Sequence, residues 1–126
     1  MPTTVKEMLA AAEAAVPRIS AEEAKALHGD PRVVFVDLRE PPEVAASGKV
    51  PGALTIPRGL LEFRADPESP LHEAAFDRAK TVITYCASGG RAALAGKTLK
   101  DMGYADVRNL GGFKDWAAAG GAVEQG

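Results

Sequence analysis

The sequence predicts an α/β domain built on a mainly parallel sheet. Short runs rich in β-branched residues alternate along the chain with stretches of helical composition. The run VVFVD at 33–37 is continuously apolar up to its aspartate, which is typical of a strand buried on both faces of a sheet. Glycines and prolines separate the segments, and no repeat or low-complexity tract interrupts them. We therefore expect one continuous α/β unit.

Local signals place the elements of the first half. Thr4 is the expected N-cap of an alanine-rich helix that Pro17 ends. Ser20 opens a second helix as a capping box with Glu23. Prolines 41 and 42 suit the first turn of a third helix. The expected elements are helices over 3–15, 20–29 and 42–47, strands over 33–37 and 53–56, and a helical turn over 58–64.

The second half repeats the strand–helix alternation after a polar loop at 65–71. Strands are expected over 81–85 and 106–109, and helices over 91–102 and 113–119. Gly111 and Gly112 predict a turn that lets the chain pass near the loop after residue 85. Trp116 is expected to pack its helix against the core.

Size and composition limit the classes of function. The chain has 126 residues, 46% hydrophobic and 25% charged, which argues for one domain with its own core. A net charge of −2 gives no general attraction to nucleic acid or anionic membranes. No apolar run reaches 18 residues, and the N-terminus does not resemble a signal peptide. The lone Cys86 excludes an internal disulfide and a cysteine metal cluster. We expect a cytoplasmic protein without metal or cofactor.

The segment TVITYCASGGRAALAGKT at 81–98 is the candidate site. Cys86 follows a buried strand and precedes a helix, so it lies where parallel α/β sheets place their ligands. Paired glycines let the loop curl with its amide groups converging, and the helix N-terminus adds partial positive charge. We expect this thiol to ionise more readily than a free cysteine. The expected substrate-binding residues are Ala87, Ser88, Gly89, Gly90 and Arg91.

Other interpretations of this segment stay open. Cys86 could be a buried structural cysteine, although such a residue does not need paired glycines and a following arginine. Cysteine phosphatases use C-x5-R, whereas the spacing from Cys86 to Arg91 is C-x4-R and suits a smaller group. His28 and His72 lie in no recognisable Cys–His arrangement, and we expect surface or capping roles for both.

The chain resembles the rhodanese family. The resemblance rests on CASGGR at 86–91, VVFVDLRE at 33–40, GKVPGALTIP at 48–57 and GYADVRNLGGFKDW at 103–116. It implies a central parallel sheet of about five strands with helices on both faces, a rhodanese domain over 18–122 and a helical extension over 1–17. It also implies that the loop cradles a persulfide on Cys86. Two positions depart from many relatives, which have histidine at Lys49 and a hydroxyl residue at Ala92.

The resemblance implies sulfur transfer by covalent catalysis. Cys86 would take sulfane sulfur from thiosulfate or a similar small anionic donor and pass it to cyanide or a thiol. A relay module that delivers sulfur to a protein acceptor is the alternative. Arg58 and Arg64 are expected near the mouth of the site, where they could steer an anion. Asp37 and Arg39 are expected to form a polar contact near the strand end, either structural or catalytic.

Overall fold

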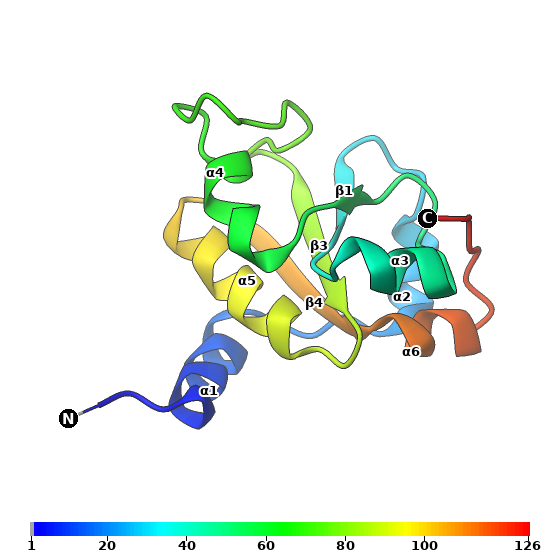
Figure 1. Cartoon of the computed structure of the whole chain (residues 1–126), viewed down its shortest axis with the longest axis horizontal. Helices are drawn as coiled ribbons and strands as arrows, with labels where there is room; N and C mark the ends of the chain where they lie inside the picture. The colour runs from blue at the N-terminus through cyan, green and yellow to red at the C-terminus, as the bar shows by residue number, and fades with distance from the viewer. Residues whose placement is uncertain (1) are drawn as a thin grey trace.

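Four parallel strands form the centre of the molecule, which a computed structural model describes for residues 2–126 (Figure 1). Their order in the sheet is β2-β1-β3-β4, and every neighbouring pair is parallel. The predicted α/β class is confirmed, with four strands where about five were expected. At the free edge of β4, Arg18 makes a single parallel bridge to Asn109. A single residue thus lies where a fifth strand would pair with β4. The strands are β1 (Val33–Asp37), β2 (Leu54–Thr55), β3 (Thr81–Cys86) and β4 (Asp106–Gly112).

The helices lie close to their predicted positions. Thr4 and Ser20 cap the first two helices through the capping boxes that the sequence predicts, with Glu7 and Glu23 as partners. Pro41 and Pro42 occupy the first turn of the third. The elements are α1 (Val5–Ala15), α2 (Ala21–Leu27), α3 (Pro41–Ser47), the 3-10 turn η1 (Arg58–Leu60), α4 (Leu61–Ala65), α5 (Gly90–Asp101) and α6 (Phe113–Ala118). In residues 2–126, no helix is both long and apolar enough to cross a membrane.

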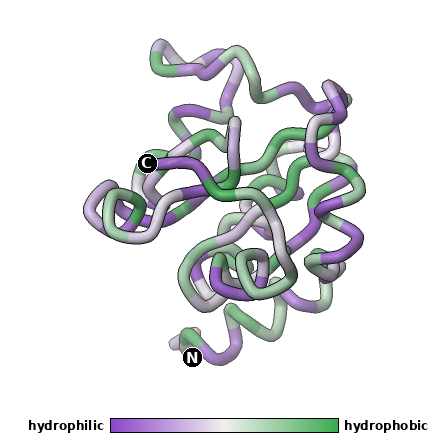
Figure 2. Tube along the Cα trace, turned by 90° about the vertical axis from the view of Figure 1, so that its right-hand side faces the viewer, coloured by the Kyte–Doolittle hydropathy of each residue, from purple (hydrophilic) through white to green (hydrophobic). Residues whose placement is uncertain are grey.

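The two faces of the sheet carry separate cores, and hydrophobic segments run through the middle of the molecule (Figure 2). Successive strand residues point to opposite faces. Val34 and Val36 of β1 therefore join the core beneath α1, α4 and α5, whereas Phe35 between them joins the core beneath α2 and α6. Trp116 is buried in this second core, against Phe35, as predicted. This partition decides which side chains can reach the loop after β3.

The end of β4 differs from the prediction. The strand continues to Gly112, so the turn expected at Gly111 and Gly112 is wrong. The pairing with β3 shifts by one residue between Thr84 and Tyr85, which leaves Leu110 as an extra residue on β4. Gly111 has a φ of +95° at this irregularity, a conformation that glycine adopts without strain. Both glycines nevertheless lie beside the loop after β3, as expected.

Candidate active site around Cys86

Cys86 is the last residue of β3, and its side chain is buried. The Sγ atom accepts hydrogen bonds from two backbone amides, Gly89 N at 3.0 Å and Ala92 N at 3.4 Å. Gly89 reaches this position with a φ of +109°, so the sharp turn requires a glycine there. Both donors are backbone amides, and both stabilise negative charge on the sulfur.

The start of α5 supplies one of these donors. The first amides of a helix have no partner within the helix, and the Ala92 amide turns to Sγ instead. The buried hydroxyl of Thr84 donates to the Ala92 carbonyl at 3.1 Å, which ties this first turn to β3. Ala92, where the family resemblance led us to expect a hydroxyl, therefore contributes through its backbone.

The end of β4 packs against the loop that follows Cys86. A Cβ atom on Gly112 would come within 2.6 Å of the Ala87 carbonyl oxygen. A Cβ atom on Gly89 would meet the Cα atom of Gly111 at 3.4 Å. Ala87 and Ser88 themselves are exposed, so the top of the loop faces solvent. The close approach at Gly112 therefore requires glycine, whereas the distance at Gly89 is an ordinary van der Waals contact.

Arg91 closes the loop, but its charge is paired. Its Nη1 and Nη2 atoms donate to the two carboxylate oxygens of Glu43 on α3, at 2.7 and 2.8 Å. The hydrogen bond from Arg91, followed by one from the Glu40 amide, lowers the pKa of Glu43 to about 2. The same contact with Glu43 raises the pKa of Arg91 further above its usual range. The pair therefore stays doubly charged at neutral pH and has no net charge.

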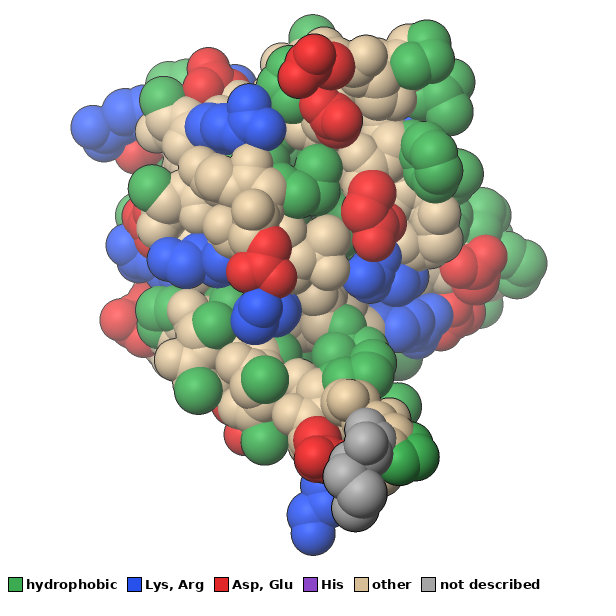
Figure 3. Space-filling view, turned by 90° about the vertical axis from the view of Figure 1, so that its left-hand side faces the viewer, with side chains coloured by type: hydrophobic (Ala, Val, Ile, Leu, Met, Phe, Trp, Pro, Cys, Tyr) green, Lys and Arg blue, Asp and Glu red, His purple; other side chains and the backbone are tan. Residues whose placement is uncertain are grey.

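Arg58 and Arg64 make their hydrogen bonds away from the loop. Arg58 pairs with Glu62 and donates to the hydroxyl of Thr98, which lies in the C-terminal half of α5. Arg64 pairs with Glu73 at 3.2 Å. Acidic and basic side chains are interspersed on the face that α1, α4 and α5 present (Figure 3). A steering role for these two arginines stays a prediction.

Asp37 and Arg39 form a buried ion pair on the other face of the sheet. Arg39 Nη2 lies 2.7 Å from Asp37 Oδ2, and Arg39 Nε also donates to this carboxylate. The guanidinium lies 4.5 Å from the centre of the Phe113 ring, within the second core. Cys86 belongs to the first core, beneath α5. The structure therefore does not bring this pair to the sulfur.

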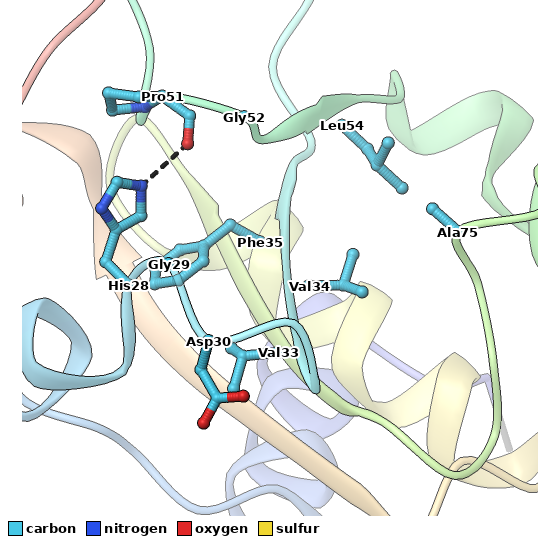
Figure 4. Close-up of a pocket in the computed structure, with 10 residues that line it drawn as sticks. All are labelled: His28, Gly29, Asp30, Val33, Val34, Phe35, Pro51, Gly52, Leu54 and Ala75. Atoms are coloured by element: carbon cyan, nitrogen blue, oxygen red, sulfur yellow. Dashed lines mark hydrogen bonds between the residues drawn. The ribbon is translucent and has the colours of Figure 1, made fainter.

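The histidines lie elsewhere. His28 follows α2 as its C-cap, and its Nε2 atom lies 2.8 Å from the Pro51 carbonyl oxygen (Figure 4). It lines a hollow of about 280 Å³ beside the first residues of β1, the opposite end of the sheet from Cys86. His72 is half-buried in the loop before β3. Lys49, where the family resemblance led us to expect histidine, donates to the Ala53 carbonyl at 3.0 Å within its own turn.

Sequence reasoning missed Glu43. Its local signal was weak, because an acidic residue in the first turn of a helix is common and is explained by capping. Glu43 does cap α3, where its carboxylate accepts the Glu40 amide at 2.8 Å. Only the tertiary structure brings it to Arg91, 48 positions later in the chain.

The Cys86 thiol lies at the end of a parallel strand, and amides of the loop that opens α5 donate to it. This arrangement defines a class of α/β proteins in which one cysteine sulfur reacts with the substrate. Residues 20–119 match the family model described as a rhodanese-like domain. The chain belongs to the rhodanese family.

Several of its curated relatives are sulfurtransferases by name. A sulfurtransferase of Allochromatium vinosum is 36% identical, over 70% of this chain and 75% of the relative. A thiosulfate:glutathione sulfurtransferase of Saccharomyces cerevisiae is 37% identical, over 73% of this chain and 70% of the relative. The human protein of that name is 30% identical, over 82% of this chain and 95% of the relative.

Solved structures agree on the fold. A Rhodopseudomonas palustris protein of unknown function, described as a possible tyrosine phosphatase, superposes with a TM-score of 0.88 at 42% identity. The match covers 98% of this chain and 99% of that one. A human single-domain sulfurtransferase superposes with a TM-score of 0.67 at 28% identity, covering 82% of this chain and 96% of that one.

Proposed function

We propose that this protein is a sulfurtransferase that carries sulfane sulfur as a persulfide on Cys86. The observation that carries the proposal is the pair of backbone amides, from Gly89 and Ala92, that donate to Sγ. Fixed amide donors aimed at a sulfur stabilise the negative charge that a thiolate or persulfide carries, as an oxyanion hole does for oxygen. The sulfurtransferase relatives support this chemistry.

The reaction needs no general acid. The Cys86 thiolate attacks the outer sulfur of thiosulfate, the S–S bond of the donor breaks, and sulfite leaves with the electron pair. Cys86 then carries an S–S⁻ group with one negative charge. Cyanide attacks the outer sulfur and leaves as thiocyanate, or a thiolate attacks and leaves as a persulfide, and the Cys86 thiolate is regenerated. Charge and atoms balance at each step without a histidine.

The names of relatives suggest donor and acceptor. Thiosulfate is named for the yeast, human and Escherichia coli relatives, and glutathione for the first two. We propose thiosulfate as the donor and a small thiol or cyanide as the acceptor, with loop residues 86–91 as the binding site. The transfer domain would span 18–122, and residues 1–17 would add a helix to it. A reducing compartment such as the cytoplasm suits a free catalytic thiol.

Phosphatase activity is the less favoured alternative. The description of the Rhodopseudomonas palustris neighbour raises it for that protein. In a C-x5-R phosphatase loop the arginine binds the oxyanion, but here Glu43 takes both terminal nitrogens of Arg91. The loop is also one residue shorter. Both features favour transfer of a single sulfur atom.

The substitution Cys86→Ser tests the proposal. We expect loss of thiosulfate:cyanide transfer, because serine cannot form a persulfide, with little change in melting temperature. Mass spectrometry after thiosulfate treatment should show one added sulfur on Cys86 in the wild type and none in the variant. Transfer near the wild-type rate in the variant would contradict the assignment. Loading with a single turnover only, on cyanide and small thiols, would favour the relay alternative.

A further inference from the structure

The Glu43–Arg91 ion pair links α3 to the loop, and it engages both Nη atoms of the guanidinium. Both terminal nitrogens of Arg91 donate to one carboxylate, in the bidentate arrangement that arginine otherwise offers to a tetrahedral oxyanion. The two side chains are about one-third exposed, so the pair lies at the surface where solutes arrive. An anion that binds both Nη atoms must displace Glu43.

The other arginines considered for the site are also paired. Asp37 binds Arg39 within the second core, and Glu62 and Glu73 bind Arg58 and Arg64. The field that these side chains present to an arriving anion is therefore weak. What remains at the loop is the set of amides on Cys86 Sγ and the start of α5.

We propose that Glu43 is a specificity-determining residue that masks Arg91 and so disfavours phosphate, which would have to place its oxygens in the sulfur-transfer loop. Thiosulfate is also tetrahedral, but it offers the loop only its outer sulfur. This inference rests on the proposed function of Cys86. Its physical reason is that the loop amides alone suffice for the one sulfur atom that thiosulfate presents, whereas phosphate gains a second, bidentate partner when the guanidinium is free. Glu43 acts through Arg91 and does not touch the reacting sulfur, so it is a positioning residue.

The test measures phosphate binding directly. Inorganic phosphate is titrated into the isotope-labelled full chain, and the amide resonances of Gly89 and Ala92 are followed by NMR. Glu43→Gln keeps an oxygen for the Glu40 amide but removes the charge. We expect phosphate to bind at these amides about fivefold more tightly than in the wild type, as expected for releasing a charge from an exposed pair. Glu43→Ala should give the same gain.

Two controls separate masking from a general change in charge or fold. Glu62→Gln removes the same charge from a matched ion pair, that of Arg58, and should leave phosphate affinity at the loop unchanged. The double variant Glu43→Gln/Arg91→Gln replaces the ion pair by a neutral pair, so its phosphate affinity should return to the wild-type value. The amide spectrum reports whether each variant is folded.

Kinetics supply the second readout. In thiosulfate:cyanide transfer, Glu43→Gln should lower the inhibition constant of phosphate about fivefold at low salt, and the gain should shrink at high salt. Unchanged binding in Glu43→Gln, an equal gain in Glu62→Gln, or a gain that persists in the double variant would overturn the masking role. The NMR arm does not depend on turnover. It therefore tests the mask even if Cys86 does not carry sulfur, a failure that Cys86→Ser would reveal separately.

Discussion

The contact between Gly112 and the active-site loop offers a sharp test of how the fold supports the site. Gly112 has a φ of −98° and a ψ of 140°, which any residue adopts, so alanine there brings no backbone strain. Its added Cβ atom would lie 2.6 Å from the Ala87 carbonyl oxygen. Gly112→Ala therefore pushes on the loop that carries Cys86 and on little else.

The size of the effect follows from that distance. Ordinary van der Waals contact begins at 3.4 Å, so the loop or the strand end must move by about 0.8 Å. Overpacking of this kind costs about 1–3 kcal/mol, and each kcal/mol lowers the melting temperature of a domain this size by about 3–5 °C. Misplacing a catalytic group by about 1 Å costs up to about a hundredfold in rate. We expect kcat/KM for sulfur transfer to fall about tenfold to a hundredfold.

The assay compares sulfur transfer and thermal unfolding in the same preparations. Gly59→Ala is the matched control, because the Cβ atom added in η1 has no neighbour within 4 Å. It should leave both quantities close to those of the wild type. Wild-type transfer in Gly112→Ala would refute the reasoning, since it would mean that the loop geometry does not depend on the end of β4. A fall in both variants would point to a general effect of removing glycine.

Two further predictions concern the loaded site and its ion pair. The chain has one cysteine, so no internal thiol can discharge the persulfide. Purified, sulfur-loaded protein should therefore keep its sulfur until an external nucleophile arrives. Rapid loss of the sulfur without an acceptor, measured by mass spectrometry, would contradict this. The lowered pKa of Glu43, about 2 against an ordinary 4.5, contributes stability that is present above about pH 4.5 and lost as pH falls toward 2. Because the pair is partly exposed, this contribution is below about 1 kcal/mol. The free energies of unfolding of the wild type and Glu43→Gln should therefore converge as the pH falls. Curves that stay parallel from about pH 6 to 2 would refute this prediction.

Local signals were enough to predict most of the elements. The capping boxes at Thr4 and Ser20 depend on residues three positions apart, so the chain needs no tertiary information to start α1 and α2 there. The loop of Cys86 was equally local, because strand, glycines and helix follow one another directly. The β4 irregularity at Leu110 was not predictable, since the β3 pairing decides which residue is left over.

The ion pairs mark the limit of the sequence. Asp37 and Arg39 are two positions apart, and their contact was expected. Glu43 and Arg91 are 48 positions apart, and no periodicity connects them. The family resemblance placed Arg58 and Arg64 near the mouth, but the sequence could not show that Glu62 and Glu73 bind them. A charged side chain can be located from sequence far more easily than its partner can.

Strand register explains why Asp37 and Arg39 lie on the opposite face of the sheet from Cys86. Asp37 pairs with Tyr85, and paired residues share a face, so the next residue, Cys86, must face the other way. Arg39, held by Asp37, also donates to the Ser47 hydroxyl and the Gly48 carbonyl, both at 2.7 Å.

These bonds fix the end of α3 against β1, and the first turn of the same helix carries Glu43 to Arg91. A buried ion pair on one face of the sheet thus positions an exposed one at the loop on the other. Loss of the Arg39 bonds should therefore alter the site through α3, because the path from Asp37 to the loop runs through that helix.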